Sequence, residues 1–212
     1  IAVIVFYARE LWQQARTINQ PVTQRVWLGI IIAFIPAGAL GFILDRLGIL
    51  DAIFNPTVVA IALIVGGFVI LWVERQERPV RIDAVDLMTW RDALKVGFAQ
   101  AFALFPGVSR VGATIIGGMM FGLSRRAATE FSFFLAVPTL VAAGAYDLYK
   151  NREALSATDF PIIAVGFVAA FVAAIIVVRY LLDYVSRHGY ALFGWWRLVV
   201  GAVGLIALLV WG

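Results

Sequence analysis

Five long apolar runs constrain the fold of this chain more than any other feature of its sequence. They cover residues 26–44, 57–73, 127–146, 160–178 and 192–211. Each run approaches the roughly 20 residues that a helix needs to cross about 30 Å of hydrocarbon, and none alternates as a transmembrane strand does. With 63% hydrophobic and 14% charged residues, the 212-residue chain is far more apolar than a soluble domain. The sequence therefore predicts an all-α integral membrane protein with a single membrane domain over residues 1–212.

A shorter apolar run opens the chain at residues 1–7, without an initiator methionine or a basic segment before it. Seven residues are too few to cross a bilayer. We expect a first helix that is partial here and continues upstream of Ile1. The prediction is then about six transmembrane helices, the first of them partial.

Residues 93–123 form an apolar stretch that is interrupted near its centre. The interruption consists of proline, glycine and polar residues: Pro106, Gly107, Ser109, Arg110 and Gly112. Each half is too short to span a bilayer, and irregular backbone at membrane depth is tolerated only inside protein or beside water. We predict a re-entrant helix-loop-helix, with its loop near residues 105–114 and the returning helix starting around Ala113.

The distribution of lysine and arginine supports this layout. If the polar loop at residues 9–25 faces the cytoplasm, 13 basic residues lie inside and three lie outside (Arg46, Lys150 and Arg152), with Arg110 in the membrane, which accounts for all 17. This asymmetry follows the positive-inside rule and requires the interrupted stretch to return to the side it entered. The C-terminus is then predicted to face outward. Membrane topology, and not a nucleic-acid partner, explains the basic composition.

The order of the elements predicts an inverted-repeat helical bundle. Three spans precede the re-entrant element and three follow it in the opposite sense, so residues 1–73 are the remainder of a first repeat and residues 93–212 are a second. A matching re-entrant element is expected before Ile1. Folds of this kind place their sites at the repeat interface, near the bilayer midplane.

Arg110 is the centre of a candidate anion site. In the sequence its nearest acidic neighbours are Asp92 and Glu130. A charge at membrane depth costs about 2.5 to 3.5 kcal/mol even on lenient insertion scales, which favours a functional role. A guanidinium fork suits phosphate oxygens, the free N–H groups of the returning helix attract anions, and Ser109 and Thr114 add hydroxyl donors.

A simpler interpretation competes with this one. Ser109 caps the returning helix, Thr114 bonds back to its own turn, and Arg110 extends toward the membrane surface. Gln100 either orients Arg110 or bonds within the helix bundle. Glu130 is expected to pair with a loop arginine and not to act as a catalytic acid.

The loop and the residues after it resemble a known family. Residues 98–115 read FAQAFALFPGVSRVGATI, followed by GGMM at 117–120, EFSFFLAVP at 130–138 and DLY at 147–149. This pattern resembles the undecaprenyl-diphosphate phosphatase family of bacteria, the bacitracin-resistance type, most specifically over residues 97–150. The resemblance implies a hydrolase of the bacterial cytoplasmic (inner) membrane that converts undecaprenyl diphosphate to undecaprenyl phosphate and phosphate. That reaction recycles the lipid carrier for cell-wall peptidoglycan synthesis.

The family's signature Pro-Gly-x-Ser-Arg-Ser-Gly-x-Thr implies catalytic roles for Ser109, Arg110 and Thr114. Its second serine is Val111 in this chain. Substrate contacts are expected from residues of the loop and of the entering helix: Gly107, Gly112, Ala113 and Gln100.

The resemblance also implies a second loop, rich in glutamate and ending in Ser-Ser-x-Gly-His, upstream of Ile1. That loop would supply the nucleophile or general base and the ligands of a divalent cation, Mg or Ca. The chain itself has no cysteine and one histidine, His188, so no metal ligand or cofactor is assigned within it. The expected partners are a polyprenyl diphosphate lipid and the bilayer, and a homodimer is compatible with the sequence.

Two further functions fit the same fold. Inverted repeats with broken helices are typical of transporters, so a lipid-phosphate transporter or flippase is one alternative. A non-catalytic lipid-binding homologue is another, favoured by Val111. Phosphate release in detergent, without a second compartment, distinguishes hydrolysis from transport.

Overall fold

The computed structural model describes residues 1–76, 78–152 and 160–211, and within these residues it is helical without a β-strand. The α-helices in chain order are α1 (Ala2–Phe6), α2 (Ala8–Arg16), α3 (Pro21–Arg46), α4 (Ile49–Ile53), α5 (Pro56–Arg75), α6 (Trp90–Ala101), α7 (Arg110–Met120), α8 (Arg125–Lys150), α9 (Phe160–His188) and α10 (Ala191–Trp211). Two short 3-10 helices are η1 (Val85–Leu87) and η2 (Phe102–Leu104). The predicted all-α fold is confirmed.

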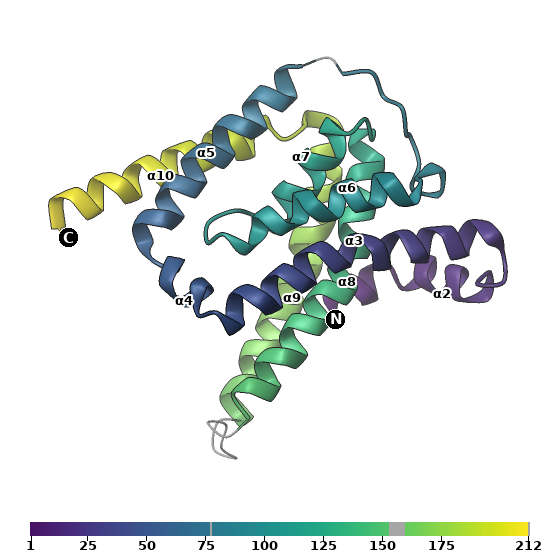
Figure 1. Ribbon diagram of the computed structural model, residues 1–212, viewed down its shortest axis with the longest axis horizontal. Helices are drawn as coiled ribbons and strands as arrows, with labels where there is room; N and C mark the ends of the chain where they lie inside the picture. Colours follow the sequence, from purple (N-terminus) through teal and green to yellow (C-terminus); the bar gives the residue numbers. More distant parts are fainter. Residues whose placement is uncertain (77, 153–159, 212) are drawn as a thin grey trace.

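Five helices are long and apolar enough to cross a membrane: α3, α5, α8, residues 160–181 of α9, and α10. They coincide with the five predicted runs, and α3 and α8 are longer than their runs because polar residues at both ends continue the helix. The first helix, α1, has five residues, and whether it is part of a longer span stays a prediction. Figure 1 shows these helices crossing one another in a layered bundle.

Two of the predicted polar connections contain helices. Residues 9–25 were expected as a loop, but α2 and the first turn of α3 occupy most of them. α2 has no buried residue, so it lies on the surface. The expected turn at residues 45–56 contains α4. For α2 the physical reason is composition, because alanine, leucine, arginine and glutamine form helix readily whether or not the segment is apolar.

α5 and α10 lie side by side in Figure 1 and approach each other through glycine. A Cβ on Gly67 would lie 2.8 Å from the carbonyl oxygen of Gly194, and one on Gly201 would lie 2.8 Å from the carbonyl oxygen of Ala60. No side chain fits at either position without moving the partner backbone. The two contacts are reciprocal, since each helix offers one glycine and one carbonyl, seven residues apart (67 − 60 and 201 − 194).

The re-entrant element packs against α3, α5 and α8. Gly97 of α6 is so close to α3 that a Cβ there would lie 2.5 Å from the carbonyl oxygen of Ala33. α7 lies beside α6 and α8 and touches α5. The hydrophobic core joins these helices and includes Ile30, Val96, Ile115, Phe131 and Leu135.

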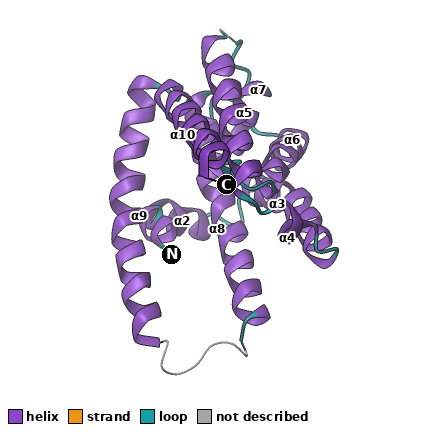
Figure 2. Cartoon of the chain, turned by 90° about the vertical axis from the view of Figure 1, so that its left-hand side faces the viewer, coloured by secondary structure: helices purple, strands orange, loops and turns teal. Residues whose placement is uncertain are grey.

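α9 is the least covered of the five long helices. Figure 2 shows it running along one side of the molecule, apart from most of α8, and its main helix contact is with α1. Only 6% of the residues in its most apolar 18-residue stretch are buried. Apolar side chains such as Ile162, Val165 and Val168 are exposed, as suits a helix that faces hydrocarbon.

Candidate functional site

The interrupted stretch folds as the predicted helix, loop and returning helix. α6 ends at Ala101, η2 continues to Leu104, and the chain turns through residues 105–109 before α7 begins. The turn uses Gly107, whose φ of +88° is a left-handed conformation that favours glycine. A Cβ on Gly107 would also lie 2.6 Å from the carbonyl oxygen of Val59 on α5, so the tip of the loop packs directly on that helix.

The returning helix begins three residues earlier than predicted, at Arg110 and not around Ala113. Ser109 is its N-cap, because its Oγ accepts from the backbone N–H of Gly112 at 3.2 Å. Gly112 therefore sits in the first helical turn, and the turn of the loop depends on Gly107.

This cap decides which backbone donors remain free. The N–H of Gly112 goes to the Ser109 side chain, and that of Ala113 goes to the Ser109 carbonyl oxygen at 2.8 Å. The N–H groups of Arg110 and Val111 have no acceptor in the part of the chain that the structure describes. They are the donors that the helix end can offer to an anion.

Arg110 lies against α8. Its Nη1 donates to the carbonyl oxygen of Ser132 at 3.3 Å, and no carboxylate of the described residues forms an ion pair with it. Its side chain is partly buried. The structure thus leaves a permanent cation beside the loop without a negative partner among residues 1–76, 78–152 and 160–211.

Thr114 lies on the side of α7 that meets α8, where Arg110 also contacts Ser132. It is fully buried, its hydroxyl donates to the carbonyl oxygen of Arg110 at 2.9 Å, and it contacts the Ser132 hydroxyl at 2.5 Å. The simpler interpretation is therefore correct for the local contacts of Ser109 and Thr114. A direct bond from Thr114 to phosphate stays a prediction.

Gln100 belongs to the bundle. Its side chain is 1% exposed, and its Oε1 lies 3.5 Å from the Thr139 hydroxyl of α8, which donates to the Leu135 carbonyl oxygen at 2.7 Å. Its Nε2 is buried and lacks a hydrogen-bond partner among the described residues. Of the two predicted roles, the structure supports bonding within the bundle.

A cavity of about 680 Å³ opens beside the loop, between α5, α6 and α7. Its walls are almost entirely apolar, with Phe98, Phe102 and Phe105 on the side of the re-entrant element. Two polar side chains line it, Ser109 and Arg197. An apolar groove with a hydroxyl and a cation at one place suits an amphiphile with an anionic head.

Arg197 is the site residue that the sequence analysis missed. The prediction placed it among the basic residues of the cytoplasmic side, but its Nη2 donates to the carbonyl oxygen of Gly107 at 2.8 Å, beside the loop tip. The signal was present, because Arg197 stands alone within the last apolar run, as Arg110 does in its own stretch. Without it the basic count becomes 12 inside (13 − 1) against three outside, and the asymmetry remains.

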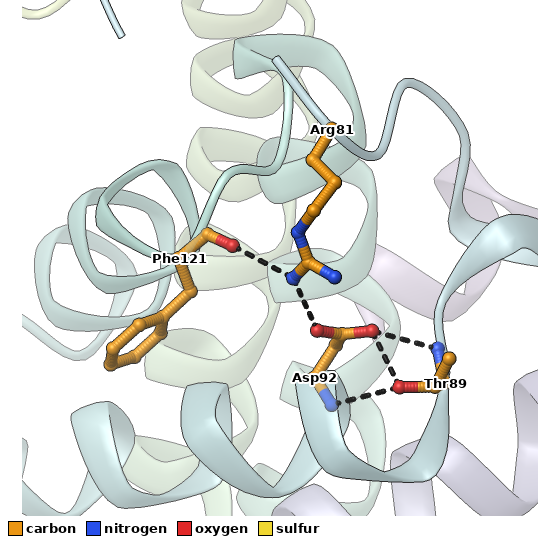
Figure 3. Close-up of polar contacts among 4 residues, drawn as sticks. All are labelled: Arg81, Thr89, Asp92 and Phe121. Carbon is orange, nitrogen blue, oxygen red and sulfur yellow. Dashed lines mark hydrogen bonds and ion pairs between the residues drawn. The ribbon is translucent and has the colours of Figure 1, made fainter. Parts of the chain in front are cut away.

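A polar cluster holds the start of α6, as Figure 3 shows. Thr89 and Asp92 form a capping box, with the Thr89 hydroxyl 2.6 Å from Asp92 Oδ2. Arg81 Nη2 lies 2.6 Å from Asp92 Oδ1 and also donates to the carbonyl oxygen of Phe121 at 3.1 Å. Burial raises the pKa of Asp92, but hydrogen bonds from Thr89 and Arg81 outweigh it and hold the pKa below its usual value.

The expected partner of Glu130 was wrong. Arg125 pairs with Glu74 at the end of α5, at 2.8 Å, and Glu130 forms no ion pair with any residue that the structure describes. Glu74 also accepts from the backbone N–H of Tyr190 at 3.0 Å. Arg125 thus pairs with the carboxylate of another helix, and the loop arginine whose charge acts on Glu130 is Arg126, four residues before it on α8.

Comparison with known proteins assigns the family. A model of the family described as "Bacitracin resistance protein BacA" matches residues 1–203. The chain belongs to the BacA family. It is 50% identical over 215 residues to undecaprenyl-diphosphatase 1 of Mesorhizobium japonicum, which covers 100% of this chain and 80% of that protein. It is 51% identical over 212 residues to undecaprenyl-diphosphatase of Dechloromonas aromatica, covering 100% of this chain and 76% of that protein.

The described residues of this BacA-family chain do not form a metal site of their own. No group of three histidine, cysteine, aspartate or glutamate side chains comes together among them. The polar side chains at the loop are instead two arginines and a serine: Arg110, Arg197 and Ser109. These residues fit an anion and do not fit a divalent cation.

Proposed function

We propose that this protein hydrolyses undecaprenyl diphosphate to undecaprenyl phosphate and inorganic phosphate, and that the loop at residues 105–109 binds the diphosphate. The observation that carries the proposal is identity of about one residue in two, along the whole chain, to proteins named undecaprenyl-diphosphatase. The loop geometry supports it, because a capped helix N-terminus, an unpaired arginine and a serine meet at one place. The chain is thus a membrane-embedded phosphatase that acts on a lipid.

Arg110 stabilises the charge of the reacting phosphate. Hydrolysis adds water to the terminal phosphorus and breaks the bond to the bridging oxygen, so negative charge builds on the leaving undecaprenyl phosphate. The guanidinium of Arg110, with the free N–H groups of Arg110 and Val111, offsets that charge in a setting with little water. Ser109 keeps these donors in place by capping α7. The group that activates the water is assigned to the second loop that the family resemblance implies.

Substitution of Arg110 tests this assignment. In the full-length protein, Arg110→Ala is expected to lower phosphate release from a prenyl diphosphate by about 100-fold or more, as removal of one transition-state donor does in other enzymes. Arg91→Ala is the matched control, because Arg91 is exposed on α6. Near-normal turnover of Arg110→Ala would reject the role of Arg110. Phosphate release in detergent by the unaltered protein separates hydrolysis from transport.

The membrane orientation follows from the basic residues. The ends of α5 and α8 that carry Glu74 and Arg125 face the cytoplasm, and the C-terminus faces outward, in the bacterial cytoplasmic membrane. The inverted repeat is supported by the reciprocal glycine contacts of α5 and α10, in which residues 60 and 67 of one helix correspond to residues 194 and 201 of the other. Both helices would then occupy equivalent places in the two repeats.

A divalent cation and a homodimer complete the proposal. The family resemblance supports Mg or Ca, but this chain's described residues do not fit one, so no step of the reaction is derived through it. Phosphate release with and without a chelator, followed by addition of Mg or Ca, tests the cation. Molecular mass in detergent tests the dimer.

A further inference from the structure

A second arginine lies beside the loop tip. The Nη2 group of Arg197 on α10 donates to the carbonyl oxygen of Gly107 at 2.8 Å and to that of Ala62 on α5 at 3.2 Å. Gly107 is the turn residue of the loop, two residues before the N-cap Ser109. The contact therefore joins α10 to the segment that orients the anion-binding end of α7.

The fold provides space for this guanidinium. A Cβ on Gly66 would lie 2.5 Å from Arg197 Nη2, so the guanidinium occupies the space that a side chain at residue 66 would fill. The Nη2 group donates to two backbone carbonyl oxygens, whereas Nε and Nη1 have no acceptor among the described residues. None of the described carboxylates pairs with Arg197 either. A cation at membrane depth with unused donors is expected to meet an anion.

The two arginines lie on different sides of the first turn of α7. Arg110 lies against Ser132 on α8, whereas Arg197 lines the cavity between α5 and α7 together with Ser109. A diphosphate carries two anionic phosphates, and the planar fork of one guanidinium matches the oxygens of one phosphate. The two arginines on either side of the loop can therefore each bind one of the two phosphates of a diphosphate.

We propose that Arg197 is a second substrate-binding residue: Arg110 holds one phosphate of the diphosphate and Arg197 holds the other. Its Nη2 group meanwhile fixes the loop through Gly107. The proposal rests on the proposed function. It extends the site beyond the loop to α10, because Arg197 is 90 residues after Gly107 in the chain. The apolar groove beside Arg197 then receives the start of the prenyl chain.

Inhibition by two inorganic anions tests the proposal in the full-length protein. Arg197→Lys keeps the charge but loses the fork, so we expect inhibition by pyrophosphate to weaken about tenfold or more and inhibition by phosphate to change less than about twofold. Arg91→Lys, on the exposed face of α6, is expected to change neither. A residue that only stabilised the loop would weaken both anions alike. Equal changes for the two anions, or no change for either, would overturn the proposal.

A measurement on the unaltered protein does not depend on how a variant folds. Phenylglyoxal modifies arginine side chains, and mass spectrometry of the peptides reports each site. Pyrophosphate is expected to protect Arg197 more than phosphate does, with Arg91 as the unprotected reference. Equal protection of Arg197 by the two anions, or protection by neither, contradicts the proposal.

The two proposals fail in different ways. If the unaltered protein releases no phosphate from a prenyl diphosphate, the proposed function is wrong. The other case is that the unaltered protein releases phosphate and Arg110→Ala is inactive, but Arg197→Lys behaves like the unaltered protein toward both anions. In that case only the proposed role of Arg197 is wrong.

Discussion

Polar contacts at the start of α6 and at the start of α7 have different roles. At the entrance, Asp92 is buried and accepts hydrogen bonds from Thr89 and Arg81, which holds the first turn of α6. At the tip, Ser109 caps α7 and so leaves two backbone donors free. The first set contributes to stability, and the second shapes the place where an anion is expected to bind.

Asp92 makes part of the stability dependent on pH. Its pKa is depressed in the fold, so its contribution is fully present above the ordinary value of 3.8 and is lost as the pH falls through the lower folded pKa. We expect Asp92→Asn to lower the free energy of unfolding by about 1 kcal/mol at pH 7, since a charged acceptor is lost while Arg81 stays half-exposed. The difference from the unaltered protein is expected to shrink below about pH 4.

Thermal unfolding in detergent at pH 7 and at low pH measures this effect. Asp86→Asn is the control, because Asp86 lies nearby on η1 and is exposed. A stability difference that stays the same at both pH values would show that the charge of Asp92 is not the cause.

Thr114 separates a structural role from a binding role. Thr114→Val removes the partner of the buried Ser132 hydroxyl, so we expect the free energy of unfolding to fall by about 1 to 3 kcal/mol. Inhibition by phosphate is expected to stay within about twofold, since the Thr114 hydroxyl is fully buried and already bonded to the Arg110 carbonyl oxygen and to Ser132. Thr114→Ser keeps the hydroxyl and is the control. Weaker phosphate inhibition with unchanged stability would instead favour direct contact with the substrate.

At the scale of helices, close approach through glycine positions the site. α5 carries Val59 and Ala62, which touch the loop tip, and α10 carries Arg197. The position of the loop therefore depends on the packing of α5 against α10. Gly67 and Gly201 set that distance, because each meets a backbone carbonyl of the other helix.

Gly67→Val is expected to disrupt this crossing. The new Cβ would meet the Gly194 carbonyl oxygen, a backbone atom that cannot rotate away, so a cost of about 1 to 3 kcal/mol or more follows from overpacking. Gly144→Val on α8 is the matched control, because nothing lies within 4 Å of a Cβ there and the β-branched residue has the same helix preference. Thermal unfolding and phosphate release are measured together. Equal stability of the two variants would show that the crossing tolerates separation.

For the whole molecule, polar contacts gather three distant segments at one end of the bundle. Glu74, in the last turn of α5, binds both Arg125, which begins α8, and the backbone of Tyr190, between α9 and α10. The Thr129 and Tyr190 hydroxyls lie 2.8 Å apart beside them. In the proposed orientation this end faces the cytoplasm, where most of the basic residues are predicted to lie.

Labelling of single cysteines tests the orientation, and the chain has no cysteine of its own. Gln76→Cys, just after α5, is expected to react with an impermeant thiol reagent only after the inner membrane is opened. A cysteine added after α10 is expected to react once the reagent reaches the outer surface of that membrane. The reverse pattern would invert the topology, and reaction of both in intact membranes would contradict the number of spans.

The sequence alone determined the five long apolar helices, the helix-loop-helix within residues 93–123 and the family signature. Each of these depends on features that are local along the chain: the length of an apolar run needed to cross hydrocarbon, a proline and a glycine that break a helix, and the order of residues in a motif. The start of α7 was misjudged by three residues, because the cap depends on the hydroxyl geometry of Ser109 and not on the glycine content of the loop.

Only the tertiary structure decided which polar groups meet. Thr114 finds Ser132 on α8, Arg125 finds Glu74 on α5, and Arg197 reaches Gly107 across 90 residues of sequence. Such pairs depend on how helices rotate and approach one another, and that is set by the packing of many side chains and of glycines such as Gly67 and Gly97. No local pattern encodes that packing, which is why the second arginine of the site became visible only in three dimensions.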